Sequence, residues 1–352
     1  MPKLAKLVDS WLDYEDLSND KEELKKLKKK VKKEAQTIIN ILCKYIRTMP
    51  GDYTEKDLKD IVNLSATDQD KLKNESEVRR LIFSEMSERC SKITIENGKK
   101  STVPGLWSEF NFDFSRAPIF YPLHNLTIEQ GQFSSARFYG EADFWGVEFT
   151  GDANFGYAEF TGDADFGYAE FTGYAYFGDA KFTKNASFRD TKFIENADFR
   201  DAEFTGNAYF GDEYFGGTKF SGNAYFGNAE FTKDADFRNT KFTKNAYFRD
   251  AYFGGARFTG NISFNRAYFK KYAPTFADKS GSALFFVQVD PQDYDFSVRS
   301  GSKPIQLGKA ELDGIERQIP VGTVLFDPSS GETSAPAKPR EDSDAEGEKP
   351  TE

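Results

Sequence analysis

The chain has 352 residues, 38% of them hydrophobic, and a net charge of −10. Two cysteines exclude a disulfide-rich secreted scaffold, while thirty-six phenylalanines indicate that one aromatic element supplies most of the core. No stretch approaches the ~18–20 consecutive apolar residues of a membrane span, and residues 1–14 lack a signal-peptide core, so we expect a cytoplasmic chain with reduced cysteines and no membrane span.

Residues 1–98 are predicted to form an α-helical region. Apolar residues recur at steps of three and four over residues 21–49, and Pro50 with Gly51 ends that helix. Two further helices are predicted near residues 55–63 and 68–91. The apolar side of the last helix is expected to be Val78, Leu81, Ile82, Met86 and Cys90.

A run of lysines marks the first half of the long helix. Seven of the nine residues from Lys25 to Lys33 are lysine. Such a run is typical of contact with an acidic lipid surface or nucleic acid, but also of a solvated helix face. We favour the solvated face, because Glu22, Glu23 and Glu34 lie beside it. Whether this helix touches an acidic surface stays open.

Residues 99–132 are interpreted as a linker and an N-terminal cap. The segment from Lys99 to Gly105 is polar and ends in a turn signal, Pro104–Gly105. After it, phenylalanines and leucines follow at uneven spacing from Phe110 to Leu126. This irregular stretch is where a cap belongs.

From Phe133 to Phe269, phenylalanine returns at alternating steps of five and six residues. A small residue, most often alanine, stands two positions before most of these phenylalanines. The pattern fits neither a helix nor a flat strand, but a very short extended face followed by a corner, with four faces closing one square coil. The predicted core consists of Phe144, Phe149, Phe155, Phe160, Phe166, Phe171, Phe177, Phe182, Phe188, Phe193, Phe199, Phe204 and Phe210.

These strings, such as Ala153–Phe155 and Ala164–Phe166, resemble the pentapeptide-repeat proteins. The resemblance implies a mainly β solenoid, a right-handed quadrilateral β-helix over residues 133–272, preceded by an α-helical region. Segments Ile41–Arg47 and Glu77–Ile82 are similar to the helical region that precedes the repeats in a subset of bacterial members. Such a rod needs a cap at each end.

Two places break the alternation. Phe215 and Phe253 each add a second consecutive step of five. We interpret each break as a dropped residue that shifts the wide corner by one face. On that count, one outward column is predicted to contain Glu159, Lys181, Glu203, Tyr225, Tyr247 and Tyr268.

The end of the chain divides into two parts. Residues 273–326 are predicted to form a small β cap, with a hairpin signal at Asp313–Gly314. Residues 327–352 are rich in Ser, Pro, Glu and Asp, so a disordered acidic tail is expected.

Little in the sequence indicates chemistry. The single histidine, His124, has no convincing acidic partner and is interpreted as a cap or surface residue. The glycines recur with the corners, and no phosphate-binding loop is present. Asn and Asp at the wide corners, such as Asp152 and Asn185, could bind calcium, but we favour hydrogen bonds to their own turns. We therefore predict neither enzyme activity nor a cofactor or metal site.

The outward residues carry the functional hypotheses. Three tyrosines in one column form a candidate partner-binding surface: Tyr225, Tyr247 and Tyr268. Residues 141–180 contain nine acidic and no basic side chains. The candidate acidic surface consists of Asp143, Glu148, Asp152, Glu159, Asp163, Asp165 and Glu170.

Two functions follow from these surfaces. The favoured one is a non-catalytic scaffold for a protein partner of unknown identity. The alternative comes from the resemblance, since some pentapeptide-repeat proteins mimic DNA with an acidic rod and modulate or protect a type II topoisomerase such as DNA gyrase. Neither function predicts direct nucleic-acid binding. The sequence leaves open whether the rods form an end-to-end homodimer.

Overall fold

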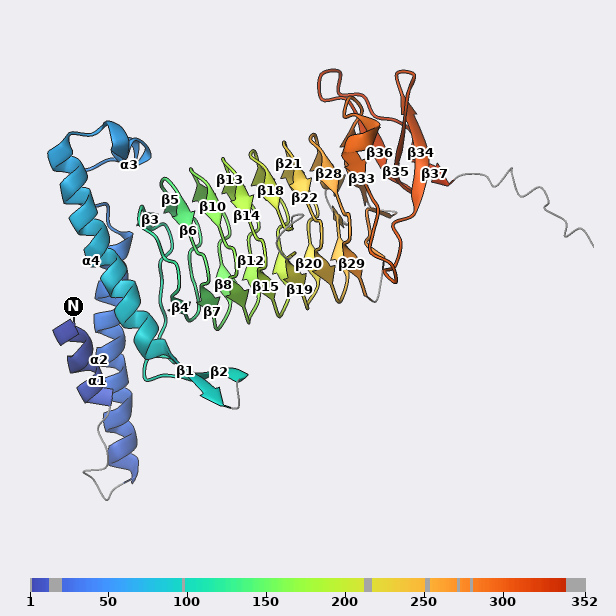
Figure 1. The fold of residues 1–352 in the computed structure, drawn as a ribbon. Coiled ribbons are helices and arrows are strands. Elements are labelled where there is room, and N and C mark those ends of the chain that lie inside the picture. Colours follow the sequence, from blue (N-terminus) through green and yellow to red (C-terminus); the bar gives the residue numbers. More distant parts are fainter. Residues whose placement is uncertain are drawn as a thin grey trace, which may run out of the picture.

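The computed structural model describes residues 2–12, 21–96, 99–211, 217–250, 254–270, 273–278 and 281–339. Figure 1 shows three parts in line: helices at one end, a straight rod of short strands, and an antiparallel sheet at the other end. In the described residues, none of the helices combines the length and the apolarity that crossing a bilayer requires.

The rod is a coil of four faces, each a parallel sheet of very short strands. Face 1 contains β6 (Ala142–Asp143), β10 (Ala164–Asp165), β14 (Ala186–Ser187), β18 (Ala208–Tyr209), β22 (Ala235–Asp236), β28 (Ile262–Ser263) and β33 (Tyr294–Asp295). Face 2 contains β4 (Thr127–Ile128), β7 (Glu148–Phe149), β11 (Glu170–Phe171), β15 (Lys192–Phe193), β19 (Lys219–Phe220), β23 (Lys241–Phe242) and β29 (Tyr268–Phe269).

The other two faces complete each coil. Face 3 contains β8 (Ala153–Asn154), β12 (Ala175–Tyr176), β16 (Ala197–Asp198), β20 (Ala224–Tyr225) and β24 (Ala246–Tyr247). Face 4 contains β3 (Pro118–Ile119), β5 (Arg137–Phe138), β9 (Glu159–Phe160), β13 (Lys181–Phe182), β17 (Glu203–Phe204), β21 (Glu230–Phe231), β27 (Arg257–Phe258), β32 (Leu284–Phe286) and β36 (Val324–Phe326). The prediction of a quadrilateral β-helix is confirmed. Pairing begins at β3, before the predicted start at residue 133.

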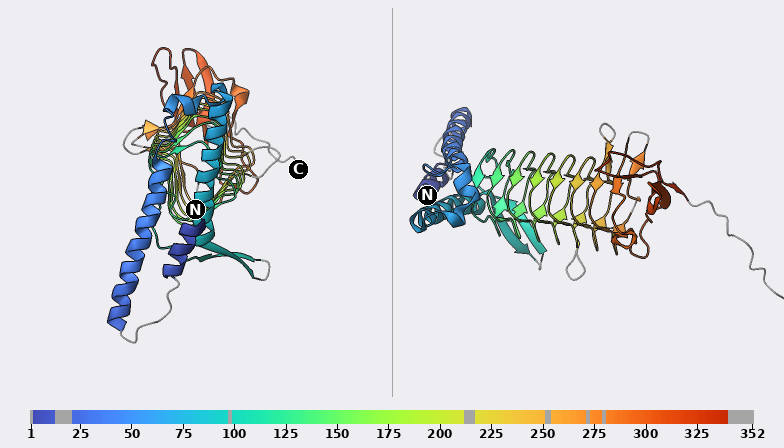
Figure 2. Two further views of the ribbon diagram at one scale, coloured as in Figure 1. Left: turned by 90° about the vertical axis from the view of Figure 1, so that its left-hand side faces the viewer. Right: turned by 90° about the horizontal axis from the view of Figure 1, so that it is seen from above.

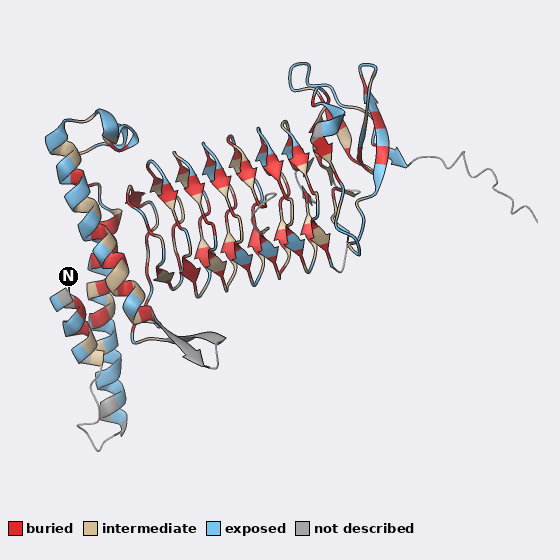
Figure 3. Cartoon of the chain, viewed as in Figure 1, coloured by how far each residue is buried: buried red, intermediate tan, exposed pale blue. Residues whose placement is uncertain are grey.

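Phenylalanine rings fill the rod in four stacked columns. Every phenylalanine of the predicted core is at most 1% exposed, and the buried positions run along the whole rod in Figure 3. Within a column the rings lie parallel; Phe155 and Phe177 have centroids 4.9 Å apart and planes 3° apart. Columns from the opposite faces 1 and 3 meet edge to face across the core, as Phe155 does with Phe166 at 5.5 Å and 86°. Both are favoured aromatic geometries.

The two breaks in the alternation are insertions, and the interpretation of them as shifts of the wide corner was wrong. In a regular corner the N–H of Thr191 donates to the carbonyl of Phe188, three residues back. The N–H of Thr218 makes the same bond to Phe210, and Phe220 stacks on Phe193, so five extra residues leave the coil there. Phe215 lies outside the described residues.

The second insertion follows Phe248, whose carbonyl accepts from Ala256. Here β25 (Arg249–Asp250) and β26 (Gly254–Gly255) pair as a small antiparallel ribbon. Phe253 lies outside the described residues. A similar ribbon, β30 (Ala277–Asp278) with β31 (Gly281–Ser282), follows in the next coil. Both insertions lie at corners and add no face to the coil. The strands of the four faces therefore keep their pairing register on either side of each insertion.

The N-terminal region folds into α1 (Pro2–Leu12), α2 (Lys21–Arg47), α3 (Glu55–Lys59), the 3-10 helix η1 (Ile61–Asn63) and α4 (Ala66–Cys90). Helix α1, which buries Ala5 and Val8, was not predicted from the sequence. Helix α4 buries Ile82, Met86 and Cys90 as predicted. Val78 and Leu81 are 40% and 41% exposed, so their place on the apolar side was wrong.

These helices close the end of the rod, as both views in Figure 2 show. Phe83 of α4 lies 4.5 Å from Phe114 and 6.3 Å from Phe133, and so lies over the first coil of the ring columns. Buried Arg79 donates from Nη1 to Ile46 O and from Nη2 to Thr48 O, which satisfies carbonyls at the end of α2. The helical region is therefore itself the N-terminal cap.

The segment between the helices and the rod is a hairpin rather than a linker. Strand β1 (Ser91–Glu96) pairs antiparallel with β2 (Lys99–Pro104), and the ribbon projects from the base of α4 in Figure 1. The lysines from Lys25 to Lys33 are exposed on α2, and Lys32 pairs with Glu109. These positions are those of a solvated helix face.

The distal end is closed by β34 (Leu307–Leu312), β35 (Ile315–Pro320) and β37 (Lys338–Pro339), which follow the 3-10 helix η2 (Pro291–Asp293). The predicted hairpin turn at Asp313–Gly314 is confirmed, with positive φ of 54° and 77° and Leu312 paired with Ile315. Strand β37 pairs with β34, so the expectation of disorder was wrong as far as Pro339. The rest of that tail lies outside the described residues.

Candidate functional site

The three tyrosines predicted to share a column do not share one. Tyr225 pairs with Tyr247 on face 3, where their rings stack at 5.3 Å and 9°. Tyr268 pairs with Lys241 on face 2. The column of Glu203 continues instead as Glu230 and Arg257 on face 4. The misplacement follows from counting the inserted residues as faces of the coil.

Face 3 brings together a different set, which we call the tyrosine strip: Tyr174, Tyr176, Asp198, Arg200, Tyr225 and Tyr247. Tyr176 pairs with Asp198, and Asp198 with Tyr225, in consecutive coils. Tyr174 lies beside Tyr176 with ring centroids 6.2 Å apart. The four tyrosines are half-buried, so each presents part of its ring to solvent.

Asp198 organises the strip although it is 0% exposed. Its carboxylate accepts from Tyr174 Oη at 2.6 Å and from Arg200 Nε at 2.9 Å. Burial and this hydrogen bond raise the pKa of Tyr174. The Arg200 guanidinium in turn lies 5.7 Å from the ring centre of Tyr225. A buried carboxylate thus fixes two side chains of an otherwise solvent-facing row.

Amide side chains orient the hydroxyls of the two stacked tyrosines. Asn223 Nδ2 donates to Tyr225 Oη at 3.1 Å, and Asn245 Nδ2 donates to Tyr247 Oη at 2.7 Å. Each asparagine lies two residues before its tyrosine, at the corner between faces 2 and 3. The rings are therefore ordered before any partner binds.

The predicted acidic residues are mostly engaged within the chain. Asp143 stacks on Asp165 and Glu148 on Glu170, as expected. Glu159, however, forms ion pairs with Arg137 and Lys59, and Glu170 pairs with Lys192 at 3.0 Å. Glu148 is only 8% exposed. These contacts neutralise or cover much of the surface that the sequence suggested.

Asp and Asn at the wide corners bond to the backbone of the following coil. Asp152 accepts from the N–H of Tyr174 at 2.8 Å, and Asp163 from that of Asn185 at 3.0 Å. Asn185 accepts in turn from Asn207 at 3.1 Å. These side chains bond to backbone N–H groups, as expected, but the N–H groups belong to the next coil and not to the same turn. No cluster of candidate metal ligands occurs within the described ranges.

His124 has the acidic partner that the sequence did not reveal. Its Nδ1 lies 2.6 Å from Asp143 Oδ2, and Arg80 Nη2 lies 3.2 Å from its Nε2. Asp143 also accepts from the N–H of Trp145. The cluster joins α4 to the first coils, because Arg80 belongs to α4 and Asp143 to β6. Its position between helix and rod is that of a structural contact.

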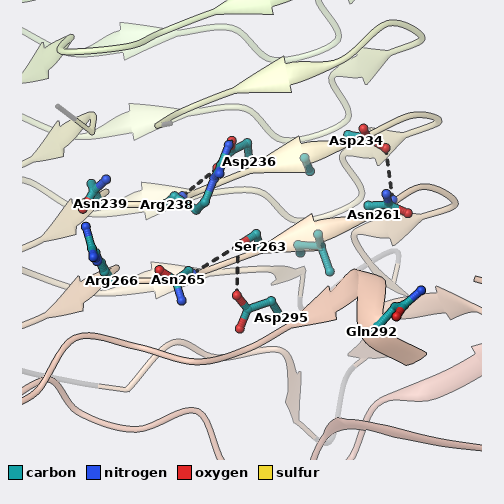
Figure 4. Close-up of a pocket in the computed structure, with 12 residues that line it drawn as sticks. Asp234, Asp236, Arg238, Asn239, Asn261, Ser263, Asn265, Arg266, Gln292 and Asp295 are labelled. Carbon is teal, nitrogen blue, oxygen red and sulfur yellow. Dashed lines mark hydrogen bonds and ion pairs between the residues drawn. The ribbon is translucent and has the colours of Figure 1, made fainter. Parts of the chain in front are cut away.

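A polar groove of about 450 Å³ lies on face 1 near the distal end (Figure 4). The groove opens at Ser263, which stands two coils after Tyr209 in the outward column of face 1. The guanidinium of Arg189 covers the ring of Tyr209 at 4.1 Å from its centre. In Figure 4, Arg238 folds back onto Asp236, and the hydroxyl of Ser263 donates to the carboxylate of Asp295. The lining residues are polar apart from Ala235 and Ile262, and include no aromatic ring. This differs from the apolar wall of a typical small-molecule site.

Comparison with known proteins agrees with this geometry. A family model described as pentapeptide repeats in nine copies matches residues 125–170, 166–213 and 215–260. No curated protein and no solved structure matches the chain. Most of the strands that build the four faces of the coil lie within the matched residues. The matched residues between 125 and 260 are therefore pentapeptide repeats, and they lie between the helical region and the distal sheet.

Proposed function

We propose that this protein is a non-catalytic scaffold that binds a protein partner through the tyrosine strip. The observation that carries the proposal is the row on face 3, in which a fully buried carboxylate, Asp198, holds Tyr174 and Arg200 in place. Tyrosine and arginine are enriched at protein interfaces and among the residues that dominate binding energy.

Preorganisation supports the proposal. The stacked rings of Tyr225 and Tyr247 are oriented by Asn223 and Asn245, so binding would not have to order them. An ordered side chain avoids a cost of roughly 0.5–1.5 kcal/mol on binding. A rigid solenoid also presents the row along a straight line, which suits an extended partner surface.

Topoisomerase modulation by DNA mimicry draws less support. Mimicry needs free carboxylates in a regular array, whereas Glu159 and Glu170 pair with cations of the chain and Glu148 is covered. The lysines of face 2 in the later coils also interrupt an acidic rod. A supercoiling assay with DNA gyrase tests this alternative. Inhibition by the wild-type protein, lost when Asp143 and Asp165 become lysine, would support mimicry over the scaffold.

The scaffold proposal is tested by comparing captured proteins between variants. Wild-type protein and the double variant Tyr225→Ser/Tyr247→Ser are used as bait in parallel, with quantitative mass spectrometry of the bound fraction. We expect at least one protein to fall about tenfold or more with the double variant, as the loss of an interface tyrosine costs ~1–2 kcal/mol. Tyr209→Ser is the matched control, because Tyr209 has the same strand position on the opposite face 1 and its hydroxyl likewise accepts from an asparagine, Asn207. Equal capture by all three baits would contradict the proposal.

A further inference from the structure

Face 2 changes the sign of its charge along the rod. Its outward column, or file, follows Thr127 with Glu148 and Glu170 and continues with Lys192, Lys219 and Lys241 in consecutive coils. Tyr268 follows in the next coil. The file ends with Arg299, whose N–H donates to Ala267 O as that of Tyr268 does to Thr240 O one coil earlier.

A second file of cations lies at the adjoining corner with face 3. The N–H of Lys270 donates to Phe242 O, and that of Lys303 to Phe269 O, so the two stand in consecutive coils. Lys244 lies at the same corner beside β23. We call the combined set the basic surface: Lys192, Lys219, Lys241, Lys244, Lys270, Arg299 and Lys303. All seven side chains are exposed.

The cations of this surface are largely unpaired. Within the part of the chain that the structure describes, one ion pair involves a residue of the basic surface, the pair of Lys192 with Glu170 at 3.0 Å. Glu195 is an exposed acid at the corner of the Lys192 coil. From Lys219 onward the file runs over three further coils without an acidic member. Like charges directly opposite on neighbouring strands destabilise a sheet, so this array opposes folding.

We propose that the basic surface docks an extended acidic segment of a partner protein. The inference rests on the proposed scaffold function and names the chemistry of its partner. Lys192 to Arg299 spans four coil steps, about 19 Å at ~4.8 Å per strand. An extended peptide of about six residues covers that distance, with alternate side chains ~6.7 Å apart along one side. Flexible lysine side chains can reach carboxylates at that spacing.

The adjoining tyrosines favour a peptide over a single-stranded nucleic acid. Proteins that bind single strands expose aromatic faces on which bases stack. Tyr225 and Tyr247 cover one another's faces, with planes 9° apart, and Arg200 lies over the other side of Tyr225. They present edges and hydroxyl groups, which suit hydrogen bonds to a polypeptide.

The test uses the full chain and a fluorescein-labelled poly-glutamate decapeptide as the probe, followed by fluorescence anisotropy. We expect saturable binding that weakens steeply as salt rises, and about tenfold or greater loss in Lys219→Glu/Lys241→Glu. The control is Lys184→Glu/Lys233→Glu, which makes the same charge change at exposed lysines of the corner between faces 4 and 1, diagonally opposite. We expect that control to retain binding to within about twofold.

Three outcomes would overturn the inference: no binding of the probe at low salt, equal loss in both double variants, or tighter binding of a labelled oligothymidylate than of the peptide. Circular dichroism of each variant shows whether the fold is kept, and Lys219→Gln/Lys241→Gln repeats the test without new negative charge. The Tyr225→Ser/Tyr247→Ser variant separates the two proposals, because it should lose captured protein while keeping most of its affinity for the probe.

Discussion

Replacement of Phe83 tests whether the helices cap the rod. The ring is 2% exposed and has aromatic neighbours at 4.5 Å (Phe114), 6.2 Å (Tyr121) and 6.3 Å (Phe133). Truncation of a buried phenylalanine to alanine costs ~3–5 kcal/mol, from lost apolar burial and the cavity left behind. We therefore expect Phe83→Ala to lower the free energy of unfolding by about that amount.

Because a solenoid is stabilised by contacts between neighbouring coils, the loss should be local. Hydrogen–deuterium exchange would show faster exchange in the first coils, around β5 and β8, with little change in β28 and β33. Urea unfolding followed by tryptophan fluorescence gives the total cost. The matched control is Leu81→Ala on the same helix, since Leu81 is 41% exposed and should lose under about 1 kcal/mol. Equal costs for the two substitutions, or uniform exchange along the rod, would refute the capping argument.

Three further predictions follow from single side chains. Burial raises the pKa of the Cys43 thiol from 9.0 to about 12, so the folded state holds the thiol proton to higher pH than the unfolded state does, and the free energy of unfolding should fall as the pH rises from 9 to 12. At pH 8, Ellman's reagent should react with Cys43 only after unfolding. Rapid labelling of the native protein would contradict this prediction. Burial and Asp201 raise the pKa of the Asp179 carboxyl above its ordinary value of 3.8, so Asp179→Asn should stabilise the fold by roughly 0.2–1 kcal/mol in urea unfolding at pH 7. The gain should vanish as the pH falls below 3.8, where the carboxyl becomes protonated in both the folded and the unfolded state. Thr191→Val removes a buried hydroxyl that donates to Phe166 O at 2.6 Å and should cost about 1 kcal/mol in thermal unfolding, more than Thr183→Val, whose exposed hydroxyl water can replace.

The core of the rod could be predicted because its rule is local. Each phenylalanine from Phe144 to Phe210 faces inward for the same reason, an alternation of extended face and corner that recurs every eleven residues. The pattern needs no long-range information, since each coil repeats the contacts of the one before. The hairpin at Asp313–Gly314 was predictable for a similar reason, because few residues adopt two successive positive φ angles.

The candidate site was not predictable in the same way. Phe215 continues the step of five as a true face would, so spacing alone cannot distinguish an insertion from a repeat. Once one insertion is counted as a face, every outward column beyond it is assigned to the wrong sheet. The row of Tyr176, Asp198 and Tyr225 becomes visible only when 27 residues, not 22, separate its last two members. Treating the five extra residues between Phe210 and Thr218 as an insertion at a corner restores the row.

The stacked rings also determine how the molecule responds to load. One column passes without interruption from Phe114 through Phe133 and five further rings to Phe276, with centroid steps of 4.8–5.2 Å. Seven such steps hold the helical end and the distal sheet about 35 Å apart. Bending would have to open strand pairs on one side and compress rings already in contact on the other. The protein is therefore built as a stiff strut, which keeps whatever attaches to its two ends at a set separation and orientation.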